Sequence, residues 1–456
     1  MFVVTLPKNR AHDAATFSRH AQKAGANLLE IRGDLTPDLP KFESSLPLLL
    51  SPRGLSLDRL PDDAPAFIDL EWNEQQDIPS EATMLIRSLH DYEKTPRFEE
   101  LLPLVASMFA SKPHVTCLKV ATRIRRAADL LTLKRIYEAF APIMPICVLG
   151  MGELAWPNRI LSPWVNPLSY VALDESERSA PGQLLLRDSV SLFHAHSPAL
   201  FAVLGGKGLK SLSPKIHNNL FKNHHVDGYY GSWPTDHLVE DFESLAEFGL
   251  VGFSVTSPHK ITMRSKMDRI DASATALPSV NTCVKEGEEW VGYQTDAEGI
   301  VNGYPEFEGI KSVAIVGSGG VVASVVDACR QLGGRRIKIF ARNAGARLQL
   351  KELLQLEDGE LSQLKEERWD LLIWTLPVDS ADLELPEPNP GGFALDLRYG
   401  RSTAFLERAA QLGYCVSDGL RMLLNQALAQ YELFCGKKAT DHDRRFLSEL
   451  MKSHVQ

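Results

Sequence analysis

One glycine-rich stretch decides the fold of the second half of this sequence: Ser312-Val313-Ala314-Ile315-Val316-Gly317-Ser318-Gly319-Gly320. An apolar run of strand length precedes the glycines, a helix-like run, Val321–Leu332, follows them, and a second apolar run covers Arg336–Phe340. A strand, a glycine turn, a helix and a second strand form the unit that opens a dinucleotide-binding domain. Gly317, Ser318, Gly319 and Gly320 are therefore candidate dinucleotide contacts, although their order departs from the usual G-x-G-x-x-G.

The residues after the second strand of this unit indicate which dinucleotide it takes. An Asp or Glu at this point normally binds the ribose hydroxyls of NAD. Here Ala341, Arg342 and Asn343 stand there instead. The planar guanidinium of Arg342 suits a 2′-phosphate, and Asn343 can donate a hydrogen bond beside it, so NADP(H) is expected. The alternative is that Arg342 is a solvent-facing loop residue.

The first half of the chain has a different texture, and the boundary lies near Arg187–Ala199. Before it, eight apolar runs of strand length recur: Phe2–Leu6, Asn27–Ile31, Leu48–Ser51, Phe67–Glu71, Met84–Ser88, Val115–Val120, Pro145–Leu149 and Ser169–Leu173. Helix-compatible spacers include Ala11–Ala24, Arg97–Ala110 and Ala127–Phe140. This pattern predicts a compact (β/α)8 barrel over residues 1–190. Such barrels usually need about 250 residues, so some outer helices must be trimmed, as over Gly54–Ala66.

The second half is expected to be a two-lobed α/β unit. A strand over Leu200–Leu204 opens a substrate-binding domain at residues 200–305, and a Rossmann-type domain follows at residues 306–420. The long apolar helix Leu420–Phe434 begins a C-terminal helical segment, residues 421–456, expected to pack back on the substrate domain.

Composition excludes several classes of protein. Among 456 residues, 49 basic and 58 acidic side chains give a net charge of −9, which argues against binding to nucleic acid or to an anionic membrane. No run of about 18 apolar residues predicts a membrane helix, and Met1–Pro7 does not resemble a signal peptide. The six cysteines form no C-x-x-C pair, so reduced thiols in a cytoplasmic protein without a zinc site are expected. No feature of the sequence indicates the oligomeric state.

Polar residues at the ends of the predicted barrel strands should meet at the C-terminal mouth, where the chemistry of this fold lies. They are Glu30, Arg32, Arg53, Glu71, His90, Lys119 and Met151. Lys119 interrupts a buried strand, and loss of hydration there favours a neutral amine that can form a Schiff base with a ketone. The alternative is an edge-strand lysine that reaches water. His90 is a possible general base or an ordinary histidine, and Glu30 and Arg32 share one strand face, where they could simply form an ion pair.

Two further sets of polar residues stand in the second half. Ser211 and Ser213 precede a helix-starting proline and could hold a carboxylate, or simply cap that helix. Lys260 follows a β run and Asp296 follows another, and such a pair could pass a proton to the oxygen of a ketone under reduction. The alternative is a surface ion pair worth under about 1 kcal/mol.

The first half resembles type I 3-dehydroquinate dehydratases over most of residues 1–185. The resembling stretches are Leu28–Asp34, Ile68–Glu71, Ser88–Asp91, the strand around Lys119, and Ser179–Gln183. The resemblance implies that Lys119 forms an imine with the substrate ketone and that His90 moves the adjacent proton. It also implies that Arg159 holds the substrate carboxylate and that Ser179 and Gln183 belong to a closing loop. Leu89 and Leu149 depart from the family pattern, although Met151 fits it.

The second half resembles shikimate dehydrogenases over about residues 200–440. The motifs are Ser211-x-Ser213-Pro214, Thr256-x-Pro258-x-Lys260, Val280-Asn281-Thr282, Thr295-Asp296, the Gly317 loop, and Asp418-Gly419-Leu420 with Gln426. The resemblance implies a catalytic pair, Lys260 and Asp296, and NADP(H) bound by the Gly317 loop, Ala341–Asn343 and Gly419. The implied substrate contacts are Ser211, Ser213, Thr256, Asn281, Tyr399 and Gln426. Ser254 and Gln294 each replace a frequent Asn.

The two resemblances concern consecutive reactions, so together they predict a bifunctional enzyme. The first half would convert 3-dehydroquinate to 3-dehydroshikimate, and the second would reduce 3-dehydroshikimate to shikimate without a metal. One alternative is a metabolite-sensing regulator that has lost catalysis, but it should lack Lys119, His90, Lys260 or Asp296, and all four are present. Another is a class I aldolase fused to an unrelated reductase, which leaves the Ser179–Gln183 motif unexplained.

Overall fold

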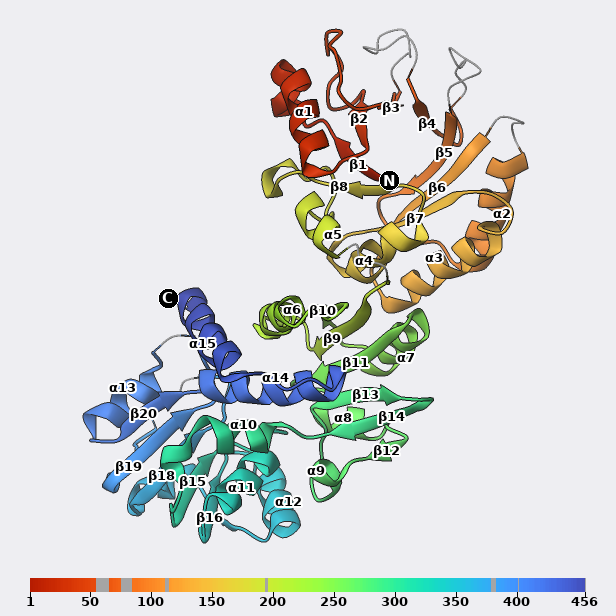
Figure 1. Cartoon of the computed structure of the whole chain (residues 1–456). Coiled ribbons are helices and arrows are strands. Elements are labelled where there is room, and N and C mark those ends of the chain that lie inside the picture. The colour runs from red at the N-terminus through yellow and green to blue at the C-terminus, as the bar shows by residue number, and fades with distance from the viewer. Residues whose placement is uncertain are drawn as a thin grey trace. The chain divides into compact units, whose positions relative to one another are not determined.

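The computed structural model describes residues 1–54, 65–74, 84–110, 115–192, 196–378, 383–400 and 402–455. The chain forms two compact units (Figure 1). The first holds Met1–Leu200 together with Val239–Leu250, and the second holds Phe201–Leu238 and Val251–Gln456. Each unit is described below by itself.

The first unit is built on one sheet of eight parallel strands, in the order β7-β6-β5-β4-β3-β2-β1-β8 (Figure 1). The strands are β1 (Phe2–Thr5), β2 (Leu28–Arg32), β3 (Leu48–Ser51), β4 (Phe67–Glu71), β5 (Met84–Asp91), β6 (Val115–Arg123), β7 (Ile146–Met151) and β8 (Ser169–Val171). The described α-helices are α1 (Ala14–Ala24), α2 (Phe98–Ala110), α3 (Ala127–Phe140), α4 (Trp156–Val165) and α5 (Leu186–Leu192). Short 3₁₀ turns are η1 (Lys8–Asp13), η3 (Glu153–Ala155) and η4 (Glu175–Glu177). The predicted barrel is confirmed.

The barrel is compact partly because one of its fully described connections has no helix. The connection between β2 and β3, residues 33–47, is fully described and contains no helix. The segment Gly54–Ala66, where the sequence predicted a trimmed helix, lies largely outside the described residues. At the other end of the unit, α5 extends to Leu192, into the segment Arg187–Ala199 where the sequence placed the boundary. Leu186, at the start of α5, is fully buried in the core of the barrel unit.

The two ends of the sheet, β7 and β8, are not hydrogen-bonded neighbours in the described barrel. Side chains from α4 and the segment after it pair with the open edge of β7 instead. The Asn166 amide accepts from the Val148 N–H and donates to the Val148 carbonyl, both at 3.0 Å. Asn158 accepts from the Gly150 N–H at 2.7 Å, and Arg159 Nε donates to the Gly150 carbonyl at 2.6 Å. These side chains satisfy backbone groups that a closing strand would otherwise pair.

Alternate residues of each strand face inward, and on β4 and β6 these inward residues change from apolar to polar along the strand. On β6, Cys117 is followed by Lys119, and on β4, Phe67 is followed by Asp69 and Glu71. The inward apolar cluster includes Val3, Leu28, Leu49, Phe67, Ile86, Cys117, Cys147 and Leu168. An apolar plug therefore fills the N-terminal end of the barrel, and the polar groups gather at the C-terminal mouth.

The second unit begins with a mixed six-stranded sheet in the order β10-β9-β11-β13-β14-β12. Its strands are β9 (Ala199–Gly205), β10 (Gly228–Pro234), β11 (Leu250–Val255), β12 (Arg269–Ile270), β13 (Thr282–Glu286) and β14 (Glu289–Tyr293). The helices along this stretch are α6 (Ser213–Asn223), α7 (Leu238–Phe248), α8 (Lys260–Arg264) and α9 (Ala272–Thr275). Strand β13 is antiparallel to both β11 and β14.

A second six-stranded sheet follows, in the order β17-β16-β15-β18-β19-β20, and its strand pairs are parallel. Its strands are β15 (Ser312–Val316), β16 (Arg336–Phe340), β17 (Glu357–Gly359), β18 (Trp369–Trp374), β19 (Pro388–Asp396) and β20 (Cys415–Asp418). The helices are α10 (Asp296–Gly303), α11 (Val322–Gln331), α12 (Ala344–Leu354) and α13 (Ala404–Gln411), with 3₁₀ turns η5 (Pro305–Phe307) and η6 (Leu361–Glu366). The predicted Rossmann-type lobe is confirmed.

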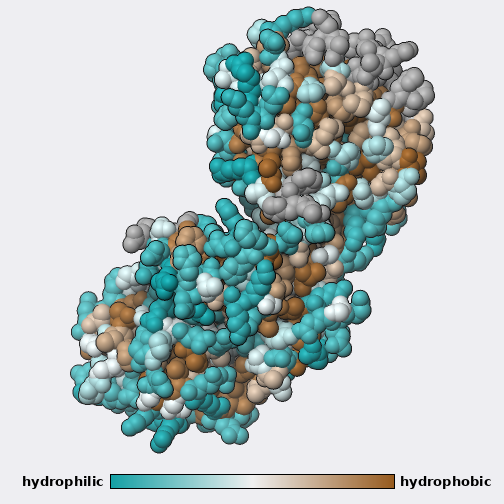
Figure 2. All heavy atoms as spheres, viewed as in Figure 1, coloured by the Kyte–Doolittle hydropathy of each residue, from teal (hydrophilic) through white to brown (hydrophobic). Residues whose placement is uncertain are grey.

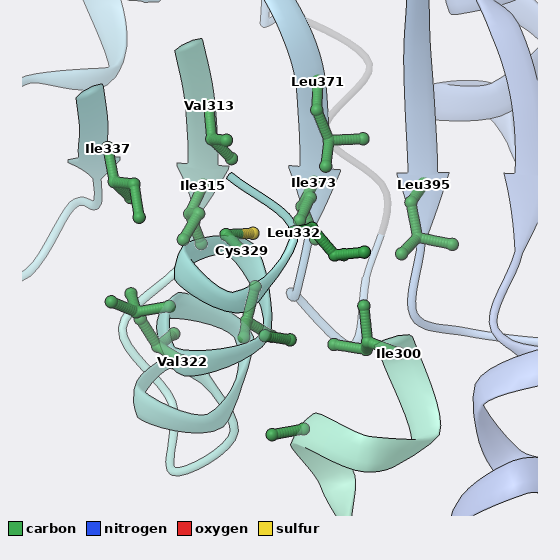
Figure 3. Close-up of a cluster of buried hydrophobic side chains, with 14 of the residues drawn as sticks. Ile300, Val313, Ile315, Val322, Cys329, Leu332, Ile337, Leu371, Ile373 and Leu395 are labelled. Atoms are coloured by element: carbon green, nitrogen blue, oxygen red, sulfur yellow. The ribbon is translucent and has the colours of Figure 1, made fainter. Parts of the chain in front are cut away.

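A buried apolar cluster holds α11 against this sheet (Figure 3). Val313 and Ile315 of β15 and their neighbours on β16, β18 and β19 face Val322, Cys329 and Leu332 (Figure 3). The glycine loop between β15 and α11 is thereby held between two buried elements, which fixes the start of the helix.

Two helices end the chain, α14 (Leu420–Cys435) and α15 (Asp441–Val455). Helix α14 packs against α10 and α6. His224, just after α6, bonds Tyr431 of α14 at 2.8 Å and Asp443 of α15 at 2.9 Å. No described helix is long and apolar enough to span a bilayer. Figure 2 shows hydrophilic side chains over most of the visible face of the second unit, interrupted by smaller hydrophobic patches.

Candidate active sites

Lys119 forms a buried ion pair inside the barrel. Its Nζ donates to Asp69 Oδ2 at 2.7 Å, and the two side chains are 5% and 0% exposed. The same Nζ lies 4.0 Å from the ring centroid of Tyr170, a cation–π contact. The edge-strand alternative is wrong, because β6 lies between β5 and β7 and the amine faces the barrel interior.

Asp69 is charged although it is fully buried. Burial alone would raise the pKa of Asp69, but the charges of Lys119, Arg53 and His90 lower it to about 2. Arg53 Nη2 lies 3.9 Å from the oxygen that Lys119 holds. Lys119 thus faces a buried carboxylate, a partner that the sequence argument, which considered burial alone, did not include.

His90 belongs to a second cluster with Glu71 and Arg53. His90 Nδ1 lies 2.5 Å from Glu71 Oε1, and Arg53 Nη1 donates to the same carboxylate. Burial, together with the positive charges of Lys119 and Arg53, lowers the pKa of His90 despite its hydrogen bond to Glu71. The imidazole is therefore neutral near pH 7: Nδ1 donates to Glu71, and the acceptor nitrogen, Nε2, lies 3.2 Å from Arg53 Nη2. Arg53 has a φ of +52°, a left-handed conformation that is strained outside glycine.

Glu30 is held by hydroxyl groups rather than by Arg32. Thr5 Oγ1 donates to Glu30 Oε2 at 2.6 Å, and Ser51 Oγ donates to Glu30 Oε1 at 2.8 Å. The alternative of an ion pair with Arg32 is wrong, because Arg32 pairs with Asp34 at 2.7 Å. Because Glu30 is bound by hydroxyl groups and not by Arg32, its carboxylate can also accept hydrogen bonds from a ligand in the barrel interior.

The loop Ser179–Gln183 closes over the same region. Gln183 Oε1 accepts from the Ser179 N–H at 2.9 Å, and Ser179 Oγ lies 3.4 Å from Thr5 Oγ1. Gly152 N–H donates to the Pro181 carbonyl at 3.1 Å, which fastens the loop to the end of β7. The structure thus connects Gln183 and Ser179 to Glu30 through Thr5, as the sequence grouped them. Met151, at the end of β7, is buried in the interior apolar cluster.

Arg159 is a buried guanidinium with no carboxylate partner in the described part of the chain. Its Nε is used by the Gly150 carbonyl, and burial lowers the pKa of Arg159 to about 10. A buried cation without a counter-charge is costly. An anionic ligand in the barrel would supply that charge, so Arg159 fits the carboxylate contact that the sequence assigned to it.

The second unit holds a cleft of about 630 Å³ between its two lobes. Seven of the residues expected to contact substrate or take part in proton transfer line it: Ser211, Ser213, Thr256, Lys260, Asp296, Tyr399 and Gln426. Gly319, Gly320 and Gly419 of the expected cofactor residues also line it. Gly317, Ser318, Ala341, Arg342 and Asn343 lie outside that lining.

Lys260 and Asp296 form the centre of this cleft. Lys260 Nζ donates to Asp296 Oδ2 at 2.5 Å, so the surface-pair alternative is wrong, because the side chains are only 14% and 5% exposed. Asn281 does not line the cleft but donates to Asp296 Oδ1 at 2.8 Å and bonds Thr295. Gln294 accepts from the Asp296 N–H at 3.0 Å, so this departure keeps a side-chain cap at the start of α10.

Polar side chains from three elements complete the substrate side of the cleft. Ser211 Oγ donates to Ser213 Oγ at 3.0 Å and also accepts from the Ser213 N–H at the start of α6, so both the capping and the binding interpretations remain compatible with it. Gln426 Oε1 accepts from Asn281 at 3.3 Å. Burial raises the pKa of Tyr399, which keeps its phenol protonated as a donor.

Two glycines of the expected cofactor site occupy positions that a side chain could not fill. Gly317 has a φ of +129°, and a Cβ there would lie 2.1 Å from Thr375 Oγ1. Gly419 approaches the Leu397 carbonyl so closely that a Cβ would lie 2.1 Å from it. At the end of β16, Arg342 is exposed, and Asn343 caps α12 through its Oδ1, which leaves its amide nitrogen available as a donor.

Sequence reasoning missed several residues of both sites. Asp69 was quoted in a motif but given no role, although it is the buried ion-pair partner of Lys119. Gln430 of α14 lines the cleft and accepts from Ser254 Oγ at 2.7 Å. Arg347 donates to the Ala341 carbonyl at 3.1 Å and pairs with Asp358, so it holds the turn that carries Arg342. Asp69 and Gln430 depend on partners distant in sequence, whereas the partners of Arg347 lie 6 and 11 positions away.

The residues that depart from the family patterns leave the reacting side chains in place. Leu89 alternates with Ser88 and His90, so its buried side chain faces away from the barrel interior. Leu149 is buried within the interior apolar cluster. Ser254 keeps a polar contact through Gln430, which donates in turn to Thr282 at 3.0 Å.

A lysine-bearing (β/α)8 barrel joined to a two-lobed dehydrogenase fold defines the class of protein. Family models agree with it: type I 3-dehydroquinase matches residues 55–197, and the shikimate dehydrogenase substrate-binding domain matches residues 203–283. A Trichormus variabilis protein named shikimate dehydrogenase (NADP(+)) is 33% identical over 52% of this chain and 90% of its own length. The chain therefore belongs to the shikimate dehydrogenase family through its second half, and its first half is a homologue of type I 3-dehydroquinases.

Proteins that carry both halves on one chain are also similar. The Arabidopsis thaliana chloroplastic bifunctional 3-dehydroquinate dehydratase/shikimate dehydrogenase is 26% identical over 78% of this chain, which covers 64% of that protein. The Chlamydia pneumoniae shikimate biosynthesis protein AroDE is 26% identical over 85% of this chain and 83% of its own length. The crystal structure of Aquifex aeolicus shikimate dehydrogenase matches 56% of this chain with a TM-score of 0.50 at 22% identity, which shows the fold.

Proposed function

We propose that this chain is a bifunctional enzyme that dehydrates 3-dehydroquinate to 3-dehydroshikimate and then reduces 3-dehydroshikimate to shikimate with NADPH. One observation carries the proposal: each half buries a lysine against an aspartate at the place where its fold puts chemistry, Lys119–Asp69 in the barrel and Lys260–Asp296 in the cleft. Homologues that unite both activities on one chain support it.

In the barrel, Lys119 forms an imine with the substrate ketone, which makes an electron sink for loss of the neighbouring proton. His90 Nε2 removes that proton and returns it to the departing hydroxyl as water leaves. Glu71 and Arg53 hold the imidazole in place. Arg159 binds the substrate carboxylate, Glu30 and Arg32 contact the remaining polar groups, and the loop with Ser179 and Gln183 excludes water.

In the cleft, Lys260 donates a proton to the ketone oxygen, and Asp296 keeps the ammonium in position. NADPH supplies the hydride when it is bound. The glycine loop at the start of α11 fits a pyrophosphate, and the exposed guanidinium of Arg342 fits a 2′-phosphate. The substrate is held by Ser211, Ser213, Thr256, Asn281, Tyr399 and Gln426. Residues Gly317–Gly320, Ala341–Asn343 and Gly419 hold the dinucleotide.

Both activating groups are lysine side chains, so the proposed reactions need no metal. The proposal assigns the barrel to residues 1–190, substrate binding to 200–305, dinucleotide binding to 306–420, and a helical segment to 421–456. It also places the enzyme in the cytoplasm with two small-molecule substrates and without nucleic-acid or membrane partners, in keeping with its net charge of −9.

The direct test is to incubate the purified full chain with 3-dehydroquinate, with and without NADPH, and to identify the products. The expected product without NADPH is 3-dehydroshikimate alone, and with NADPH it is shikimate. A protein that binds 3-dehydroquinate but converts none of it would support a sensing role and overturn the proposal. Carbon–carbon bond cleavage would instead indicate an aldolase.

A further inference from the structure

We propose that Asp69 is a catalytic residue: it takes the proton from Lys119 and gives it to the departing oxygen while the imine forms. The inference rests on the proposed dehydration and adds a proton acceptor and donor for its first step. Asp69 Oδ2 lies 2.7 Å from the reacting Nζ, and both side chains are buried.

The pair explains how a lysine that is buried beside a carboxylate can react. An ammonium is not a nucleophile, so Lys119 must lose a proton before it can add to a ketone. The acids nearby are otherwise engaged: Glu71 is bound by His90 and Arg53, and Glu30 by Thr5 and Ser51. Asp69 Oδ1 has no hydrogen-bond partner within the described residues, so this carboxylate keeps acceptor capacity.

The proton balance of the step closes within the pair. A proton moves from the Lys119 ammonium to the Asp69 carboxylate, and the neutral amine forms a bond to the ketone carbon. The carbonyl oxygen takes up the second amine proton and becomes a hydroxyl group. Asp69 then protonates that hydroxyl, the carbon–oxygen bond breaks, and water leaves. The iminium carries one positive charge, as the ammonium did, and Asp69 is again a carboxylate.

Asp69 thus serves as counter-ion at both ends of the step. Positive charge stays on the same nitrogen, 2.7 Å from the carboxylate before the reaction and still facing Tyr170. Because no net proton is exchanged with solvent, the rate of imine formation should not depend on the fraction of Lys119 that solvent deprotonates at a given pH. This property separates a proton-transferring Asp69 from one that merely fills space.

The first experiment compares unmodified full-length protein with Asp69→Asn, using 3-dehydroquinate and cyanoborohydride and following adduct formation by intact mass. A positioned proton-transfer group contributes about 10²–10⁴ in rate, so the adduct should form at least about 100-fold more slowly in the variant. KM should stay within about threefold, since Asp69 reaches the substrate only at the oxygen that leaves. Asp129→Asn makes the same carboxylate-to-amide change at the start of α3, where Asp129 accepts from the Arg125 and Arg126 N–H groups, and should leave both KM and the rate of adduct formation within about threefold.

The second experiment uses the unmodified protein and avoids any folding defect of the variant. The rate of adduct formation at saturating 3-dehydroquinate should stay within about threefold between pH 8 and pH 5.5. A roughly tenfold fall per pH unit would mean that solvent deprotonates Lys119, and it would overturn the role of Asp69. So would an Asp69→Asn variant that forms the adduct at the unmodified rate. An unmodified protein that forms neither adduct nor 3-dehydroshikimate would instead overturn the proposed dehydration.

Discussion

The two units each bury a lysine against an aspartate, but they surround these pairs differently. In the barrel, Lys119 and Asp69 are almost fully enclosed, and the cationic Arg53 and the ring of Tyr170 are their neighbours. In the cleft, Lys260 and Asp296 are slightly more exposed, and hydrogen bonds from Asn281 and from the Asp296 backbone to Gln294 fix them.

This difference matches two kinds of chemistry. A covalent imine must persist until the hydroxyl group has left and must then be hydrolysed to release the product, and the barrel buries the reacting amine above its interior apolar cluster. A hydride transfer leaves no covalent bond to the protein, so the cleft needs only a proton donor and a route by which a dinucleotide can enter. We infer that the same residue pair is used for bond formation in one unit and for proton donation in the other.

The largest expected effect comes from removing each lysine in turn. Lys119→Ala should abolish dehydration, by at least about 10⁴-fold, while NADPH-dependent reduction of added 3-dehydroshikimate stays within about twofold. Lys260→Ala should give the reciprocal result. Separate assays on the two purified variants measure this, and equal loss of both activities in a folded variant would break the comparison between independent sites.

A smaller effect is expected at the dinucleotide end of the cleft. Arg342→Ala should raise KM for NADPH about 10- to 100-fold, because one charge-assisted contact of about 1.5–3 kcal/mol is lost. KM for NADH should change little, and dehydration should not change. Arg335→Ala, at an arginine before β16, is the control and should leave both cofactors unaffected. Equal use of NADPH and NADH by the unmodified enzyme would show that Arg342 does not recognise the phosphate.

The cleft also has an acid-sensitive residue behind it. His217 is fully buried, stacked on Tyr230 at 4.2 Å, and neither ring nitrogen has a hydrogen-bond partner among the described residues. Burial lowers the pKa of His217 to about 3. Between pH 6.5 and pH 3 the unfolded chain therefore binds a proton at this position that the folded chain does not.

The free energy of unfolding should accordingly fall as the pH drops through this window, by up to about 1.4 kcal/mol per pH unit from His217 alone. Above pH 6.5 this contribution should be flat. Urea unfolding of His217→Phe between pH 7 and pH 4 should show a shallower loss of stability than the unmodified protein. Identical slopes would show that the buried imidazole takes up its proton without unfolding.

The sequence predicted the framework well where periodicity is strong. The strands Leu48–Ser51, Phe67–Glu71, Ser312–Val316 and Arg336–Phe340 and the helix Ala127–Phe140 have the predicted bounds, because apolar runs end at clear breaks. Strands β5 and β6 run several residues past their predicted ends, since polar residues such as His90 continue the strand where the barrel interior is polar. The predicted boundary segment Arg187–Ala199 begins within α5.

Sites were harder to predict because their residues meet only in three dimensions. Lys119 could be found from one polar residue in an apolar run, but its partner Asp69 lies 50 positions earlier in a strand that looked ordinary. Gln430 looked like one more residue of an apolar helix. The side chains of Asn158, Arg159 and Asn166 form hydrogen bonds with the backbone of the edge strand β7, as a neighbouring strand would. No local sequence pattern predicts this role.

The central claim is that the enclosed pair makes a covalent bond to its substrate and the cleft pair does not. Full-length protein should be treated with borohydride in the presence of 3-dehydroquinate, then digested and analysed by mass spectrometry, with Lys119→Ala as control. The account predicts a stable mass increase of the reduced ligand on a peptide that contains Lys119, none on a peptide that contains Lys260, and none in the control. An active, unmodified protein that gains no mass at Lys119, or gains it at Lys260, would contradict the account.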